Sequence, residues 1–215
     1  MEKKMIDSTI LELMASRICH DLISPVGAVN NGVEFLQEDM GSGDAGDAIG
    51  LISMSAESAA ARLQVFRLAY GTGGRDATIK PADVHKVFGD LLATENKVTQ
   101  DWDGHAVFAD YDRPEGFSKL LICGLMLAQE ALPKGGVIRV THDASSAVTT
   151  VTAEGNDAMI RPQVDAALNL KLAPSVIDPR LVHPYVIGVL AAQYGHSVTI
   201  AAQDEGRIAF NIAKL

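Results

Sequence analysis

The chain has 215 residues, of which 47% are hydrophobic and 21% are charged. This length suits one large or two small folded domains, and the composition excludes a disordered chain and a disulfide scaffold. The net charge is -9 and there is no long run of Lys or Arg, which argues against nucleic acid or an anionic membrane surface as the main partner.

The sequence shows no sign of a membrane segment, a metal site or a disulfide. The longest apolar stretch, residues 120–128, is less than half of the roughly 20 residues that a spanning helix needs. The first ten residues contain no signal-peptide core, and we expect a cytoplasmic protein. The two cysteines, Cys19 and Cys123, belong to no CxxC pair. Cys19 directly precedes His20, but successive helix residues point about 100° apart and cannot pair as nucleophile and base.

Two long amphipathic helices are predicted first along the chain. In residues 6–40 and again from Ile49 to Tyr70, apolar residues return every three or four positions. Residues 41–47, GSGDAGD, form the turn between them. The apolar positions are Met14, Ile18, Leu22, Val26, Val29, Val33, Leu36 and Met40, then Ile49, Ile52, Ala56, Ala59, Leu63, Phe66 and Tyr70. The two segments predict an antiparallel helical hairpin.

A lone hairpin has too few faces to bury both apolar stripes. Pairing with a second copy of the hairpin solves this, because four helices enclose a common core with two-fold symmetry. We therefore expect a homodimer built on a four-helix bundle. The alternative is that the hairpin packs on the rest of its own chain.

After the hairpin the pattern changes to short alternating elements. Residues 71–80 have the composition of a linker, so we place the domains at 1–75 and 76–215. The second domain is predicted to be a two-layer sandwich of a mixed sheet and helices, which makes the whole chain α+β. Its predicted helices are Ala82–Asn96, Glu115–Leu132 and Arg180–Tyr194, and its predicted strands are Val98–Trp102, Ala106–Asp110, Val137–His142, Val148–Ala153, Ser197–Ala202 and Arg207–Ile212.

One motif in the first helix carries chemistry. Residues 20–25 read HDLISP, and helical geometry places His20 about 200° from the apolar stripe, facing solvent. Arg17, Ser24, Gly27 and Asn31 share its face, and the small side chains leave room for another protein to approach the imidazole. Arg17, one turn before His20, offers a cation for a phosphoryl group.

The motif resembles the H-box of sensor histidine kinases, H-[DE]-L-x-x-P, which lies in the first helix of a hairpin. The resemblance implies that the second domain is like the kinases' ATP-binding domain. Laid along that pattern, the asparagines of the magnesium-binding N-box fall on Cys123 and Leu127, Glu154 is off register for the adenine-binding Asp, and Asp157 replaces a glycine. The phosphate loop has only Gly188 in residues 182–190. We therefore expect this domain to bind neither ATP nor magnesium.

A phosphoacceptor hairpin joined to a degenerate nucleotide-binding (Bergerat) domain is similar to the ChpT-type histidine phosphotransferases of alphaproteobacteria. Residues 15–36 lie close to that family's signature, and the layout matches over essentially the whole chain. The resemblance implies a cytoplasmic two-component phosphorelay: a homodimer receives a phosphoryl group from the receiver domain of a hybrid kinase. It then passes the group to receiver domains of response regulators, in that family CtrA-like cell-cycle regulators.

On this interpretation His20 is the phosphoacceptor that forms phosphohistidine. Asp21 holds the ring tautomer or acts as a base, and Arg17, Ser24, Gly27 and Asn31 contact the receiver. No cofactor is expected in this chain, because magnesium belongs to the receiver domain. Two alternatives remain: an ATP-dependent sensor histidine kinase core, and a non-catalytic dimeric adaptor whose histidine is incidental.

Overall fold

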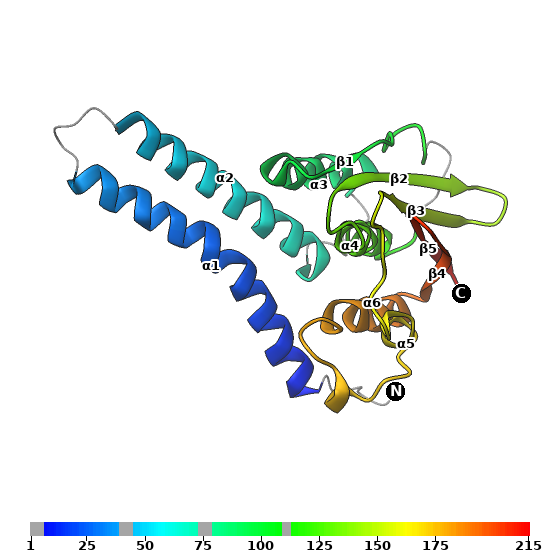
Figure 1. Ribbon diagram of the computed structural model, residues 1–215. Helices are drawn as coiled ribbons and strands as arrows, with labels where there is room; N and C mark the ends of the chain where they lie inside the picture. The colour runs from blue at the N-terminus through cyan, green and yellow to red at the C-terminus, as the bar shows by residue number, and fades with distance from the viewer. Residues whose placement is uncertain (1–6, 39–44, 73–78, 109–112) are drawn as a thin grey trace.

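The N-terminal hairpin is present as two long antiparallel helices. The computed structural model describes residues 7–38, 45–72, 79–108 and 113–215 (Figure 1). Helix α1 spans Ser8–Glu38 and continues through Pro25, and α2 spans Ala45–Ala69. Asp7 begins α1, because its carboxylate accepts a hydrogen bond from the backbone N–H of Thr9 at 2.9 Å. Most of the predicted turn at 41–47 lies outside the described residues, as do Ile6 and Met40.

Residues 79–215, which we call the α/β region, form a mixed sheet covered by helices. The sheet order is β1-β2-β3-β5-β4, with β1 parallel to β2 and all other pairs antiparallel. The elements are α3 Pro81–Glu95, β1 Val98–Gln100, α4 Phe117–Glu130, β2 Gly136–Asp143, β3 Val148–Glu154, α5 Val164–Leu168, the 3-10 helix η2 Pro174–Val176, α6 Val182–Gln193, β4 His196–Asp204 and β5 Arg207–Lys214. The predicted α+β class and two-layer arrangement are confirmed. The predicted boundary between domains, at residue 75, falls in the undescribed segment 73–78 and stays a prediction.

Two differences from the predicted elements have local causes. The predicted strand Ala106–Asp110 is wrong where the structure describes it, because residues 104–108 form turns. The Asp103 carboxylate accepts hydrogen bonds from the N–H groups of His105 and Ala106, at 2.7 and 3.3 Å, and this starts a turn. The short helices α5 and η2 were not predicted, because segments of five and three residues are too short to show a period.

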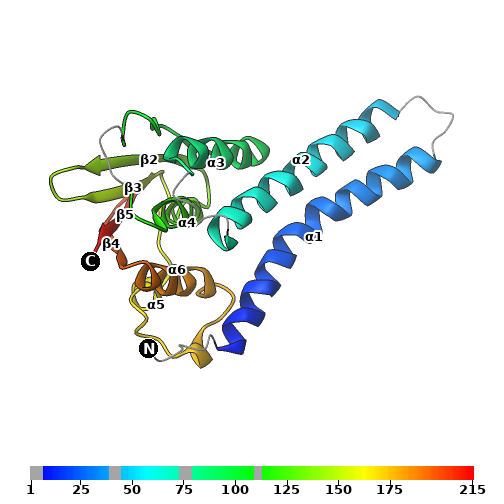
Figure 2. The ribbon, with the colours of Figure 1, turned by 180° about the vertical axis from the view of Figure 1, so that it is seen from behind.

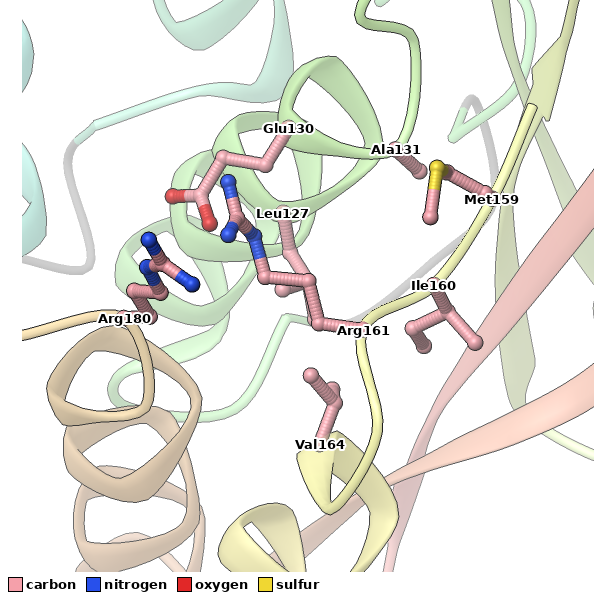
Figure 3. A pocket seen from close by; sticks show the side chains of 8 residues that line it. All are labelled: Leu127, Glu130, Ala131, Met159, Ile160, Arg161, Val164 and Arg180. Carbon is pink, nitrogen blue, oxygen red and sulfur yellow. The ribbon is translucent and has the colours of Figure 1, made fainter. Parts of the chain in front are cut away.

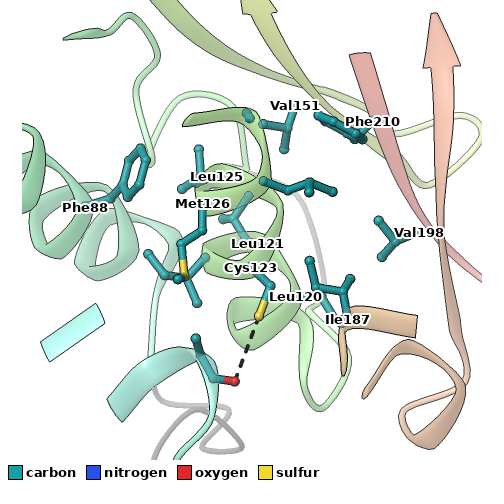
Figure 4. Close-up of a cluster of buried hydrophobic side chains, with 14 of the residues drawn as sticks. Phe88, Leu120, Leu121, Cys123, Leu125, Met126, Val151, Ile187, Val198 and Phe210 are labelled. Atoms are coloured by element: carbon teal, nitrogen blue, oxygen red, sulfur yellow. Dashed lines mark hydrogen bonds between the residues drawn. The ribbon is translucent and has the colours of Figure 1, made fainter. Parts of the chain in front are cut away.

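Helix α4 is the centre of the core. Every residue from Phe117 to Ala128 is buried, since the helix lies between the sheet and the helices α2, α3 and α6 (Figure 4). Buried side chains of the sheet, such as Val151 and Phe210, meet it from one side, and Phe88 of α3 meets it from another. A helix whose buried residues are mostly apolar on every face is typical of such a central position.

The hairpin packs on the α/β region through only part of its length. The C-terminal half of α2 contacts α3 and α4, and α1 contacts α6 and η2, while the connected ends of the two helices project away (Figures 1 and 2). Lys119 of α4 is buried at this junction, and its ammonium group donates hydrogen bonds to the carbonyl groups of Leu68, Ala69 and Gly71, at 3.3, 2.9 and 2.7 Å. These carbonyl groups lie at the end of α2, where no further backbone N–H group of the helix is available to bind them. Lys119 therefore caps the helix.

Candidate functional site

His20 presents its imidazole to solvent from the middle of α1. Its side chain is 88% exposed, and that of the neighbouring Asp21 is 29% exposed. Nδ1 of His20 lies 3.2 Å from Oδ1 of Asp21, within hydrogen-bonding distance. The Nε2 atom is on the opposite side of the ring and is directed away from this contact. The carboxylate favours the tautomer in which Nδ1 carries the proton, which leaves a lone pair on Nε2.

The surface that follows His20 along α1 is open. Ser24 and Asn31 are exposed and Gly27 is half-buried. A Cβ atom built on Gly27 would meet no other atom within 4 Å. Another protein therefore has room to lie along this face beside the imidazole. The role of these three residues in partner contact remains a prediction.

Arg17 differs from its predicted position on the solvent face. Its side chain is only 18% exposed, and its guanidinium group forms an ion pair with Glu130 at the end of α4. The side of α1 that carries Arg17 faces the α/β region, where this half-buried carboxylate neutralises the cation. The guanidinium therefore points to α4, and its predicted use as an exposed cation beside His20 does not match this conformation.

Glu130 joins Arg17 to a second helix of the α/β region. Nδ1 of the fully buried His183, on α6, lies 2.7 Å from Oε1 of Glu130. The ring of Tyr70 meets the His183 ring edge to face, with 6.1 Å between centroids. Sequence reasoning missed Glu130, His183 and Tyr70 as partners of the motif, because Glu130 is 113 positions from Arg17 and no local spacing connects them.

The charges around Glu130 set its ionisation. Burial acts to raise its pKa, but the charges and hydrogen bonds of His183 and Arg17 outweigh burial and lower the pKa from 4.5 to about 2. Burial also acts to lower the pKa of Arg17, yet the Glu130 carboxylate raises it above its ordinary value. The carboxylate and the guanidinium are therefore both charged at neutral pH.

The stability that Glu130 contributes should be lost in acid. Because its pKa is lower in the folded chain than the ordinary 4.5, the contribution is complete above that pH and disappears as the pH falls toward about 2. We expect the difference in free energy of unfolding between the wild type and Glu130→Gln, measured by urea denaturation, to shrink across this window. A difference that stays constant from neutral pH down to about pH 3 would contradict the shift.

The residues that align with nucleotide-binding positions of kinases are buried or paired with other side chains in this chain. Cys123 is fully buried with Sγ 3.9 Å from the carbonyl oxygen of Ala69, and burial raises the pKa of its thiol to about 12. Leu127 lines a small hollow between α4 and residues 159–164, into which Arg161 and Arg180 extend toward Glu130 (Figure 3). Glu154 pairs with Arg139 and Asp157 pairs with Lys134 at 2.9 Å.

The described part of the chain shows neither a metal-ligand cluster nor a membrane span. Among residues 7–38, 45–72, 79–108 and 113–215, no group of three or more His, Cys, Asp or Glu side chains is placed to hold a metal ion. Within the same ranges, no helix combines the length and the apolar character that crossing a membrane requires.

Comparison with known proteins identifies the family. Residues 81–206 match the family model "Histidine phosphotransferase C-terminal domain". The chain is 36% identical over 197 residues to Protein phosphotransferase ChpT of Brucella abortus (strain 2308), and the match covers 90% of each protein. The chain belongs to the histidine phosphotransferase family.

Solved structures agree with this assignment. A structure described as a 1.7 Angstrom structure of a bacterial phosphotransferase matches with a TM-score of 0.74 and 31% sequence identity, and the match covers 97% of this chain and 98% of the other. The likeness spans both the hairpin and the α/β region, so the predicted resemblance to ChpT-type histidine phosphotransferases is confirmed over nearly the whole chain. Membership of the histidine phosphotransferase family supports histidine phosphotransfer in a phosphorelay.

Proposed function

We propose that the chain relays a phosphoryl group through His20, from the receiver domain of a hybrid sensor kinase to receiver domains of response regulators of the CtrA-like class. The observation that carries the proposal is the solvent-exposed His20 on α1, with Asp21 at Nδ1, in a histidine phosphotransferase. In the forward step the Nε2 lone pair attacks the phosphorus of an aspartyl phosphate in line. The N–P bond forms, the P–O bond to the donor aspartate breaks, and that aspartate leaves as a carboxylate.

Asp21 is proposed to assist this step without taking a proton. The phosphorylated ring keeps its Nδ1 proton and so gains positive charge, which the adjacent carboxylate offsets. The donor receiver supplies the magnesium ion and the acidic pocket, so this chain needs only a positioned, uncharged imidazole and a docking surface. The return step to a second receiver is the same displacement run backwards.

The proposal is tested by the intact mass of the protein under two conditions. In the first, the chain is mixed with a phosphate-loaded receiver domain of a hybrid kinase, without ATP. In the second it receives only magnesium and ATP. A gain of one phosphoryl group with the receiver alone, lost in acid, is the expected result. A gain from ATP alone would instead identify a kinase, and no gain in either sample would favour an adaptor.

We further propose that two hairpins pair into a four-helix bundle. Among the described residues, four large side chains of the predicted apolar stripes remain exposed on the single chain: Val26 at 50%, Val33 at 39%, Ile49 at 55% and Leu63 at 52%. Intramolecular packing does not cover them, although it covers Val65, Phe66 and Ala69 at the end of α2. An exposed apolar surface of this kind marks a contact with another protein, and a second copy of the same stripe is complementary to it.

Leu63→Glu is expected to separate the dimer. A carboxylate placed in the apolar seam of the bundle would lose its water without gaining a partner, so the dissociation constant of the dimer should rise about 100-fold. Analytical ultracentrifugation over a concentration series measures this shift. Gln64→Glu adds the same charge at the next exposed position and serves as the control. Equal dimer stability in the two variants would show that Leu63 lies outside the interface.

A further inference from the structure

A cluster of four polar side chains lies where the hairpin meets the α/β region. Arg17 comes from α1, Tyr70 follows α2, Glu130 ends α4 and His183 belongs to α6. Glu130 is the centre, because Arg17 and His183 both bind its Oε1 atom. Tyr70 closes the cluster through its edge contact with His183. The cluster thus connects α1 and the residue that follows α2 to α4 and α6.

The cluster leaves several polar atoms without partners. Nε of Arg17, Oη of Tyr70 and Nε2 of His183 are buried and have no hydrogen-bond partner among the described residues. Such groups each cost stability, and a buried ion pair is often no more stabilising than apolar side chains of the same volume. The stability that the cluster contributes therefore does not by itself explain why the cluster is present. Its directional contacts, by contrast, allow only one orientation of α1 against α4 and α6.

The orientation matters because Arg17 is one helical turn from His20. Residues three apart on a helix are close neighbours on its surface, so fixing Arg17 fixes the rotation of α1 that aims the imidazole. The hairpin otherwise meets the α/β region mainly through the end of α2. The ion pair to Glu130 therefore restrains the part of the hairpin that carries the motif.

We propose that Glu130 is a positioning residue for phosphotransfer, which acts through Arg17 to hold α1 so that His20 and the α/β region face one docked receiver together. The inference rests on the proposed relay function. It predicts that loss of the Glu130 charge weakens productive docking of the receiver and leaves the reactivity of the imidazole intact. A misplacement of about 1 Å can lower a transfer rate by up to about 100-fold.

The test compares two phosphodonors on the full chain. A phosphorylated receiver domain must dock, whereas phosphoramidate, a small phosphodonor, reaches the exposed His20 without docking. The variants are Glu130→Gln, Arg17→Gln and the double variant, with thermal melts to check folding. Arg62→Gln is the matched control, because Arg62 also connects the hairpin to the α/β region, through Glu95 at 2.7 Å, but from α2.

The expected result is a split between the two donors. Glu130→Gln should raise the receiver concentration for half-maximal transfer about tenfold or more, and should change labelling by phosphoramidate less than about twofold. The double variant should lose less than the sum of the two single variants, because Arg17 and Glu130 share one contact, although Glu130 also contacts His183. Arg62→Gln should transfer like the wild type.

Four results would overturn the inference. Additive losses in the double variant would show that Glu130 acts independently of Arg17. An equal loss of transfer from the receiver in Arg62→Gln would show that any weakening of the contact between the hairpin and the α/β region has the same effect. A loss of phosphoramidate labelling in Arg17→Gln, but not in Glu130→Gln, would show that Arg17 contacts the phosphoryl group directly. If the wild type accepts phosphate from phosphoramidate but from no receiver, the relay function itself fails, and the positioning role fails with it.

Discussion

Replacing His20 by alanine is expected to abolish phosphorylation by a phosphate-loaded receiver domain. The substitution removes the nucleophile, and no other group on the exposed face of α1 can form a phosphoramidate in its place. We expect a loss of more than about 1,000-fold in the transfer rate, as for other catalytic nucleophiles. The measurement is the intact mass of the acceptor over time, with acid treatment to confirm the labile N–P bond.

The control for this variant is His105→Ala. His105 is also an exposed histidine, but it lies in the turn after Asp103, far along the sequence from the motif. It should accept phosphate at the wild-type rate. Circular dichroism and ultracentrifugation should show that His20→Ala remains folded and in the same oligomeric state, since the side chain is 88% exposed and packs on little. Continued labelling of His20→Ala would refute His20 as the acceptor.

Lys119→Met is expected to cause a large loss of stability. Methionine keeps the length of the side chain but removes the donor that binds three carbonyl groups at the end of α2. Buried carbonyls that lose their partner cost about 1 to 3 kcal/mol each, offset in part by no longer burying a charge, so we expect a net loss of about 3 kcal/mol. Urea denaturation followed by circular dichroism measures the free energy of unfolding.

Lys86→Met provides the comparison for this loss. Lys86 forms an exposed pair with Asp90 at 2.7 Å, with its side chain 75% exposed. Exposed pairs of this kind contribute little, and the change should stay within about 0.5 kcal/mol. If Lys119→Met were as stable as Lys86→Met, water would have to reach the end of α2 and replace the ammonium group.

The sequence predicted those helices and strands in which apolar residues follow a local repeating pattern. The three-and-four spacing of apolar residues predicted α1 and α2, and the short β patterns predicted the strands β2 to β5. The strand predicted at Ala106–Asp110 was wrong over residues 106–108, because the Asp103 side chain redirects the backbone by hydrogen bonds that hydrophobic spacing does not record. The helix α5 was missed because it has no full period to detect.

The site was predictable to the extent that it depends on one helix. Helical geometry predicted the exposure of His20, Ser24 and Asn31, because all three are placed by the apolar stripe of α1. It also predicted exposure for Arg17, whose direction instead depends on Glu130, a residue brought near only by the packing of α1 on α4. A long charged side chain turns toward its partner, and a contact across more than a hundred residues leaves no local signal.

The position of Cys123 leaves no room for a larger polar side chain between α4 and the end of α2. The sequence pattern aligns Cys123 with an asparagine of the kinase N-box, and the Cys123 sulfur lies against the backbone of α2. Restoring the amide would insert a larger polar group into a space with no exposed surface, next to helix carbonyls that Lys119 already satisfies. The end of α2 would have to move away from α4 to admit such a side chain, so docking of the hairpin and a larger polar group at residue 123 exclude each other.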